Sequence, residues 1–254
     1  MGRFRQRGCF PFYYIIGISM LLFWRMVLAH LLGDFTLQSD LVAKWKRESW
    51  FGMPLHCLTH LITLLALTWP FLGQRWVYGM KGWQICIAIT LIHYIVDITR
   101  VFLIRRFNVR DGLVMFAIDQ ILHYYVLFLA AGHIKIPEGI SLLPVKWFII
   151  FSLFAFTAHA VTVTGYYMDR ELDHNKKYPP AGARYFLMAE RIVLMLFFFL
   201  PGVFWMPFAF LWILQIYLMK TRRVVDVSSI SLALNILVPV VAGSAGRIVF
   251  YGHF

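Results

Sequence analysis

The chain has 254 residues, of which 61% are hydrophobic and 14% are charged, and its mean hydropathy is +0.71. This balance is typical of a membrane-embedded protein and excludes an ordinary soluble domain. The formal charge of +12 would also suit nucleic-acid binding. However, the Lys and Arg residues lie mainly in short loops between apolar segments, where membrane orientation and anionic headgroups explain them better. We therefore expect membrane lipids as partners and no nucleic acid, and the sequence identifies no protein partner.

Eight apolar stretches are long enough to cross a hydrocarbon core about 30 Å thick, directly or with tilt. In chain order they run at about 12–38, 54–79, 83–105, 112–132, 145–168, 184–200, 203–220 and 226–246. The stretches 184–200 and 203–220 form either two full spans or a re-entrant hairpin, because only Pro201 and Gly202 separate them. The sequence thus predicts an all-α fold, a polytopic membrane bundle of seven or eight helices.

The N-terminal stretch carries Arg3, Arg5 and Arg7 ahead of its apolar residues and superficially resembles a signal peptide. No small-residue cleavage site follows, so we interpret it as a retained first helix. We divide the chain into a four-helix part, residues 1–132, and a set of C-terminal helices, residues 133–254.

The first four predicted helices each carry two metal-binding side chains spaced four residues apart. These pairs are His30/Asp34, His56/His60, His93/Asp97 and Asp119/His123. Residues at this spacing lie on one face of a helix. Because an Asp at the centre of a spanning helix costs roughly 2.5–3.5 kcal/mol, intramembrane ionisable groups indicate a functional site. One such pair alone is more often structural, but four pairs together favour metal binding over a proton pathway or a structural network.

The four pairs also share a depth in the membrane. At a rise of about 1.5 Å per residue, all of them fall within roughly 3 to 16 Å of the helix ends on the side of the first and third loops. We therefore expect a four-helix bundle with an inward ring of five imidazoles and three carboxylates. Gln38 and Gln120 would orient these ligands, or equally would cap helix ends or pair across helices.

The donor set predicts which ion the ring binds. Imidazole and carboxylate suit Zn, Mn or Fe, while the lack of clustered thiolates argues against copper(I) and iron–sulfur centres. We expect one or two divalent ions, with Zn preferred, and all eight residues of the ring as candidate ligands. Two ions about 3.5–4 Å apart would generate hydroxide and stabilise an oxyanion during hydrolysis. Asp34, Asp97 and Asp119 are the candidate catalytic carboxylates, one of them as general base.

Basic residues surround the ring side of the bundle. Lys44, Lys46, Arg47, Arg100, Arg105 and Arg106 form an expected basic rim that favours an anionic substrate such as a phospholipid or isoprenoid phosphate. The odd-numbered loops carry most of the cations, so the positive-inside rule places them, and the site, in the cytoplasm. The three N-terminal arginines argue the other way.

Three segments carry a resemblance to a known family: HLLGDFTLQ at residues 30–38, HYIVD at 93–97 and DQILH at 119–123. They resemble the motifs of a bacterial membrane family catalogued as domain of unknown function 3307, over about residues 20–130. The His/Asp pattern is also similar to that of inner-membrane proteins labelled metal-dependent hydrolases. The resemblance implies a multi-pass protein of the bacterial inner membrane.

The leading hypothesis is a membrane-embedded metal-dependent hydrolase that acts on an anionic, lipid-linked substrate. The first alternative is a metal-ion or proton channel or carrier, although that requires polar continuity to the far face, where residues 61–69 and 126–131 are nearly all apolar. The second is a non-enzymatic accessory subunit with a closed structural metal site. Glu190 is a candidate base or extra ligand, with an interfacial or arginine-paired role favoured, and His159 is expected to be a core histidine.

Overall fold

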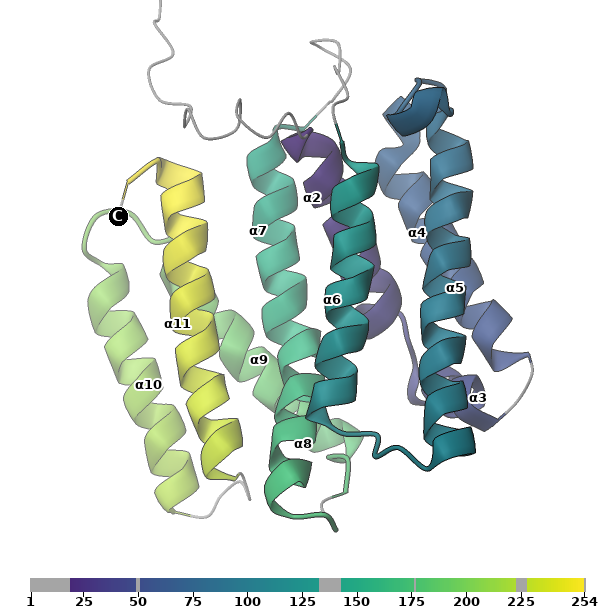
Figure 1. Cartoon of the computed structure of the whole chain (residues 1–254). Coiled ribbons are helices and arrows are strands. Elements are labelled where there is room, and N and C mark those ends of the chain that lie inside the picture. The colour runs from purple at the N-terminus through teal and green to yellow at the C-terminus, as the bar shows by residue number, and fades with distance from the viewer. Residues whose placement is uncertain (1–18, 49–50, 133–142, 176, 223–227, 254) are drawn as a thin grey trace, which may run out of the picture.

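The computed structural model describes residues 19–48, 51–132, 143–175, 177–222 and 228–253, and every regular element in those ranges is helical. The elements are α2 (Met20–Leu31), the π-helical turn η1 (Leu32–Thr36), α3 (Asp40–Glu48), α4 (Gly52–Thr68), the 3₁₀ turns η2 (Trp69–Phe71) and η3 (Val77–Gly79), α5 (Gly82–Phe107), α6 (Leu113–Ala130), α7 (Val145–Ala155), the π-helical turn η4 (Phe156–Ala160), α8 (Val161–Leu172), α9 (Ala181–Phe197), α10 (Trp205–Thr221) and α11 (Ser229–Tyr251). The long helices run side by side, while α9 is tilted against them (Figure 1). The predicted all-α fold is confirmed.

Five helical segments are long and apolar enough to cross a membrane, so the chain is a helical membrane protein. They are Gly52–Phe71, Gly82–Phe107, Leu113–Ala130, Val145–Leu172 and Ser229–Tyr251. A sixth span results if the bent pair Met20–Thr36 and Asp40–Lys46 crosses as one unit. The helices α9 and α10 have only 17 residues each, so a total of seven or eight spans stays a prediction. Residues 12–18 of the expected first helix, with the N-terminal arginines, lie outside the described residues.

Proline and residues with positive φ set several helix ends. The helix α4 stops at Thr68 rather than near residue 79, because Pro70 cannot donate to a continuing helix. The helix α5 ends at Asn108, whose φ of 52° is left-handed, and α7 begins directly after Pro144. At the end of α11 the φ of Gly252 is 81°, a conformation that suits glycine.

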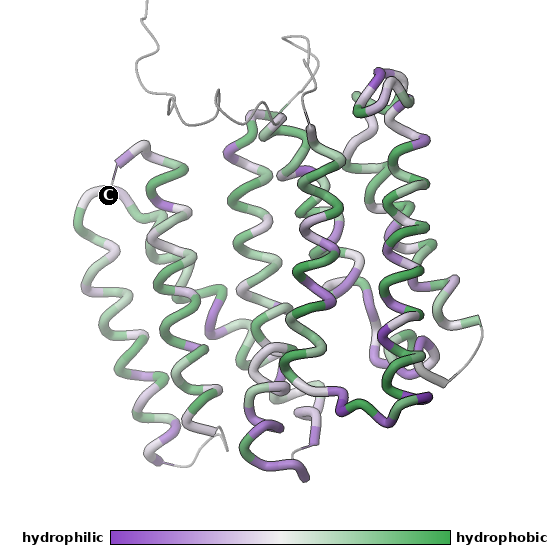
Figure 2. The backbone as a smooth tube through the Cα atoms, viewed as in Figure 1, coloured by the Kyte–Doolittle hydropathy of each residue, from purple (hydrophilic) through white to green (hydrophobic). Residues whose placement is uncertain are grey.

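The chain bends sharply between α2 and α3, near the predicted end of the first helix at residue 38, and α3 lies where a loop was expected. The π-helical turn η1 follows α2, and α3 then leaves at 91°. The Ser39 hydroxyl caps the new helix by accepting from the Val42 amide at 3.3 Å. The short α3 is amphipathic, as is typical of a helix at a membrane interface. Hydrophilic stretches gather most clearly in the lower connections of Figure 2, at the end of the bundle where α3 lies.

The helices α2, α4, α5 and α6 share a hydrophobic core at the end of the bundle away from α3. Its fully buried members include Leu22 and Met26 of α2, Leu64 of α4, Ile89 of α5 and Leu127 of α6. A second cluster holds α9, α10 and α11 together. The helix α7 packs against both α2 and α11, and the division of the chain at residue 132 stays a prediction. The His and Asp residues of α2, α4, α5 and α6 lie between this first core and the end of the bundle near α3.

Candidate metal centre

The structure brings together all eight residues of the predicted ring. His30 lies in the last turn of α2 and Asp34 in η1, while α4, α5 and α6 supply one pair each. Each of the eight residues is buried, with at most 8% of its surface exposed. Three overlapping groups of ligand-type atoms result, each with all atoms within 4.8 Å of one another: His30, Asp34, His60 and His93; His56, His93 and Asp97; and Asp97, Asp119 and His123. Buried groups of this composition can hold a metal ion.

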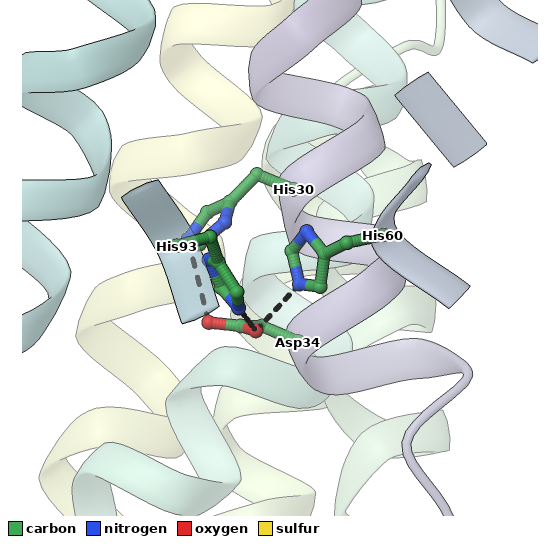
Figure 3. Close-up of side chains that lie close together, drawn as sticks. All are labelled: His30, Asp34, His60 and His93. Atoms are coloured by element: carbon green, nitrogen blue, oxygen red, sulfur yellow. Dashed lines mark hydrogen bonds and ion pairs between the residues drawn. The ribbon is translucent and has the colours of Figure 1, made fainter. Parts of the chain in front are cut away.

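The Oδ1 atom of Asp34 is the point on which the imidazoles converge. It lies 2.7 Å from Nε2 of His60, 3.1 Å from Nε2 of His56 and 3.5 Å from Nε2 of His93. The other carboxylate oxygen is 3.5 Å from Nε2 of His30. Figure 3 shows the rings of His30, His60 and His93 gathered around this carboxylate. Nε2 of His56 and Nε2 of His93 are only 3.1 Å apart, so one of them faces the other with a lone pair.

Asp119 and His123, the pair that α6 supplies, have buried polar atoms without a hydrogen-bond partner among the described residues. Within the described residues, neither ring nitrogen of His123 has a hydrogen-bond partner, and neither has Oδ1 of Asp119. The His123 ring stacks on that of His93 with centroids 4.0 Å apart, and its Nδ1 is 3.9 Å from Oδ2 of Asp119. Burying an unpartnered polar atom is unfavourable by about 1–3 kcal/mol. A bound ion would give these atoms the partner that they lack. The donor set therefore fits a divalent ion.

A close backbone approach shapes the His60 side of the ring. Gly33 belongs to η1, directly before Asp34. A Cβ atom at Gly33 would lie 2.8 Å from Nε2 of His60, closer than real contacts allow. The glycine therefore lets the η1 backbone come near the imidazole. Sequence reasoning did not assign it this role.

Lys46 lies inside the cluster, which corrects its assignment to an outer basic rim. Its Nζ is 2.6 Å from Oδ2 of Asp97, and only 18% of the lysine side chain is exposed. The same Asp97 oxygen is 3.4 Å from Nε2 of His56 and 3.3 Å from Nε2 of His93. The bend before α3 turns this lysine toward the ring, so its ammonium group shares a carboxylate with two imidazoles.

Arg100 is likewise an inner residue rather than part of a rim. It donates from Nη1 to Oδ2 of Asp119 at 3.2 Å, and from Nη2 to Asp111 at 2.7 Å and to the Tyr167 hydroxyl at 2.9 Å. Asp111 and Tyr167 were not identified from the sequence. Three partners on different elements hold the guanidinium in place, and it in turn fixes one oxygen of Asp119.

Gln120 forms hydrogen bonds to three residues of the ring, two of them across helices, and its role in orienting metal ligands stays a prediction. Its Nε2 donates to Oδ2 of Asp34 at 3.1 Å and to Oδ2 of Asp119 at 3.2 Å, while its Oε1 lies 3.2 Å from Nε2 of His30. Gln38 instead lines the adjoining cavity.

Two other candidates lie outside the three ligand groups. Glu190 belongs to α9, where its backbone carbonyl accepts from the Trp212 indole at 3.2 Å. His159 is half-buried in η4. Neither residue belongs to a cluster of ligand-type atoms in the described part of the chain.

Cavities border the ring on the side of α3. A cavity of about 180 Å³ is lined by Asp34, Lys46, Asp97, Arg100 and Asp119 together with apolar residues. A larger cavity of about 680 Å³ shares part of that lining and continues between α3 and α9. On the opposite side of the ring the space is about 10 Å³, room for no more than one water. The ring therefore opens to one side.

The fold and these residues define a helical membrane protein with a buried His/Asp cluster of the kind that can hold a metal. The family described as "Protein of unknown function (DUF3307)" matches residues 22–150, just over half of the chain. The chain belongs to this family, which confirms the resemblance drawn from residues 30–38, 93–97 and 119–123. The match contains all four pairs of the ring. No curated protein and no solved structure matches the chain.

Proposed function

We propose that the protein is a membrane-embedded metal-dependent hydrolase of the bacterial inner membrane that acts on an anionic, lipid-linked substrate. One observation carries the proposal: a single Asp34 oxygen has Nε2 atoms of His56, His60 and His93 within 3.5 Å, beside a cavity. The imidazoles come from two helices and the carboxylate from a third. Convergence of nitrogen and oxygen donors from facing helices is the arrangement by which helical bundles build metal sites.

The ring offers ligands for one or two ions. The residues around Asp34 would hold the first, and Asp97 is available for a second, either with His56 and His93 or with Asp119 and His123. Zn suits these donors best, with Mn and Fe as the other choices. A bound ion supplies a Lewis acid and makes hydroxide accessible at neutral pH.

When the ring holds a single ion around Asp34, Asp119 is the candidate carboxylate best placed to act as general base. Arg100 and Gln120 fix its Oδ2 atom, whereas its Oδ1 is buried and has no hydrogen-bond partner among the described residues. Asp119 also lines the cavity. A carboxylate held by one oxygen, with the other available, can accept a proton from a water in that cavity. Asp34 and Asp97 are instead surrounded by imidazoles and Lys46.

The one-sided opening supports an enzyme over a carrier. A transport path would continue past the ring, but there Leu64, Ile89 and Leu127 are buried in the apolar core. The side of the ring that opens is also the side with the basic loops. The positive-inside rule therefore favours a site that faces the cytoplasm.

A hydrolysis assay tests this function. Purified protein is stripped of metal, reloaded with Zn²⁺, Mn²⁺ or Fe²⁺ and offered short-chain phospholipids, isoprenoid phosphates and carboxylic ester lipids. We expect turnover that requires metal, falls at least about 100-fold in Asp119→Asn and persists in Glu190→Gln as a matched acidic control. Metal binding without turnover of any of these substrates would contradict the enzyme and favour the accessory-subunit alternative.

A further inference from the structure

The charged residues that line the smaller cavity disfavour the binding of an anionic substrate. Its lining includes the carboxylates of Asp34, Asp97, Asp111 and Asp119 but only three cations, Lys46, Arg100 and Arg105. With neutral imidazoles the formal charge is therefore −1. A pocket of net negative charge disfavours anions, because its potential opposes their entry. The expected substrate thus needs a further source of positive charge.

The cations differ in how firmly they are held. Arg100 has three hydrogen-bond partners, so its guanidinium is committed to Asp119, Asp111 and Tyr167. Arg105 is exposed. The Lys46 ammonium, in contrast, has one short ion pair, 2.6 Å from Oδ2 of Asp97, and a flexible four-carbon stem that reaches the cavity. Lys46 is therefore the inner cation that can most readily change partners.

Asp97 is also the carboxylate for which a metal would compete with Lys46. Its Oδ2 atom already lies within 3.4 Å of the Nε2 atoms of His56 and His93, and these three residues form one of the ligand groups. A divalent ion at this group and an ammonium on the same oxygen would repel each other across a few ångströms in a buried setting, where charge interactions are strong.

We propose that a divalent ion displaces Lys46 from Asp97 and that the freed ammonium then binds the anionic phosphate group of the substrate in the cavity. Binding is ordered, with metal first and phosphate second. One divalent ion changes the formal charge of the lining from −1 to +1, and Lys46 becomes the residue that recognises the anion. This inference rests on the proposed function and adds the order of binding and the recognition group.

The test compares Lys46→Met with Lys44→Met, a matched control on the exposed face of the same helix. Metal affinity is measured by titration with Zn²⁺ and Mn²⁺, and phosphate binding by calorimetry with inorganic phosphate, before and after metal loading. In the wild type we expect phosphate binding only after loading. Lys46→Met should bind metal roughly tenfold more tightly, because a competing charge is gone, and should bind phosphate at least roughly tenfold more weakly. Lys44→Met should match the wild type in both measurements.

Two further arms sharpen the result. Lys46→Gln removes the charge but keeps a hydrogen-bond donor, so it gives the same answer if Lys46→Met does not fold. Dihexanoyl phosphatidic acid in place of inorganic phosphate distinguishes a lipid headgroup from free phosphate as the preferred source.

Phosphate binding that is equal with and without metal, or unchanged in both Lys46 variants, would overturn the ordered scheme and leave the metal centre intact. Failure of the wild type to take up metal at all would overturn both this inference and the proposed function.

Discussion

The two halves of the chain bury polar residues in different ways. In the N-terminal half, imidazoles and carboxylates converge until one Asp34 oxygen faces three ring nitrogens, and both nitrogens of His123 lack a hydrogen-bond partner among the described residues. In the C-terminal half, the buried Arg191 donates to the Asn235 amide at 2.8 Å, to the Ala158 carbonyl at 2.7 Å and to the Thr162 hydroxyl.

Convergence of ligand-type atoms beside a cavity distinguishes the site from a structural network. Unpartnered atoms alone do not, because the Nε atoms of Arg191 and Arg247 also lack a hydrogen-bond partner among the described residues. Arg191 joins α9, η4, α8 and α11 through neutral partners, as expected of a polar group that fixes helix positions. Arg247 similarly donates to the carbonyls of Phe198, Leu200 and Gly202 after the end of α9. The ring instead gathers ligand-type atoms beside a cavity. Variants in the two regions should therefore affect different properties.

The largest expected effect is on stability, in the C-terminal network. Arg191→Met leaves Asn235, Thr162 and a carbonyl without their charged donor, which should lower the free energy of unfolding by about 3–5 kcal/mol. Metal content should stay at the wild-type value. Thermal unfolding in detergent and elemental analysis measure the two properties, with exposed Arg106→Met as the control. Metal loss without a fall in melting temperature would contradict the separation.

A substitution in the ring should affect metal binding and leave stability nearly unchanged. Asp34→Asn keeps the shape and a hydrogen-bonding oxygen but removes the charge at the point of convergence. Metal affinity should fall roughly 100-fold, which corresponds to about 2.7 kcal/mol, while the melting temperature of the metal-free protein changes little. Metal titration followed by elemental analysis checks this. Unchanged affinity would exclude Asp34 as a direct ligand.

A smaller effect should follow from crowding the ring without altering its chemistry. In Gly33→Ala the new methyl group would meet the His60 imidazole, which has to shift. Displacing one ligand in this way should reduce metal affinity roughly tenfold, at the lower end of the range for changes that reorient ligands. Gly182→Ala is the matched control, because a Cβ there meets nothing within 4 Å. Equal affinities in the two variants would contradict the role of Gly33.

The smallest effect concerns the ion pair that joins the starts of α3 and α9. Arg184 contacts both Asp40 oxygens, at 2.6 and 2.5 Å, and lowers the pKa of Asp40 from its ordinary value of 3.8. Because the folded pKa is the lower one, the pair stabilises the protein above about pH 4, and this contribution is lost as the pH falls through the folded pKa. Asp40 is 68% exposed, so the contribution should stay below about 1 kcal/mol.

Melting temperatures measured across this pH range test the Asp40 prediction. Asp40→Asn should lower the melting temperature slightly at pH 7, and this difference from the wild type should shrink as the pH falls below about 4. Asp173→Asn, in the exposed loop after α8, is the control for removing an exposed carboxylate. A difference between Asp40→Asn and the wild type that does not shrink at low pH would contradict the assignment.

The ring was predictable because its signal is local. A spacing of four residues fixes the face of a helix, and the distance to the nearest loop fixes the depth, so His93 and Asp97 could be placed together from the sequence. Arg100 could also have been placed, since it follows Asp97 by three residues and shares its face. It was instead predicted at the rim, because the positive-inside rule alone explains a cation near a helix end.

Other features depend on backbone geometry that hydropathy does not encode. The 91° bend after η1 and the helix α3, where the sequence predicted a loop, bring Lys46 next to Asp97. Residues of η1 and α3, on both sides of the bend, line the two cavities. The early end of α4 depends on one residue, Pro70, within a stretch that is otherwise apolar enough to continue.

Elemental analysis of the detergent-purified protein tests the central claim most directly. The wild type is compared with His56→Ala/His60→Ala and with His159→Ala, a control that removes a half-buried imidazole outside the ligand groups. We predict one or two equivalents of Zn, Mn or Fe in the wild type and in the control, and loss of the metal in the double variant. Wild-type protein without metal, even after reloading, would contradict the metal centre and leave the ring as a polar network or proton pathway.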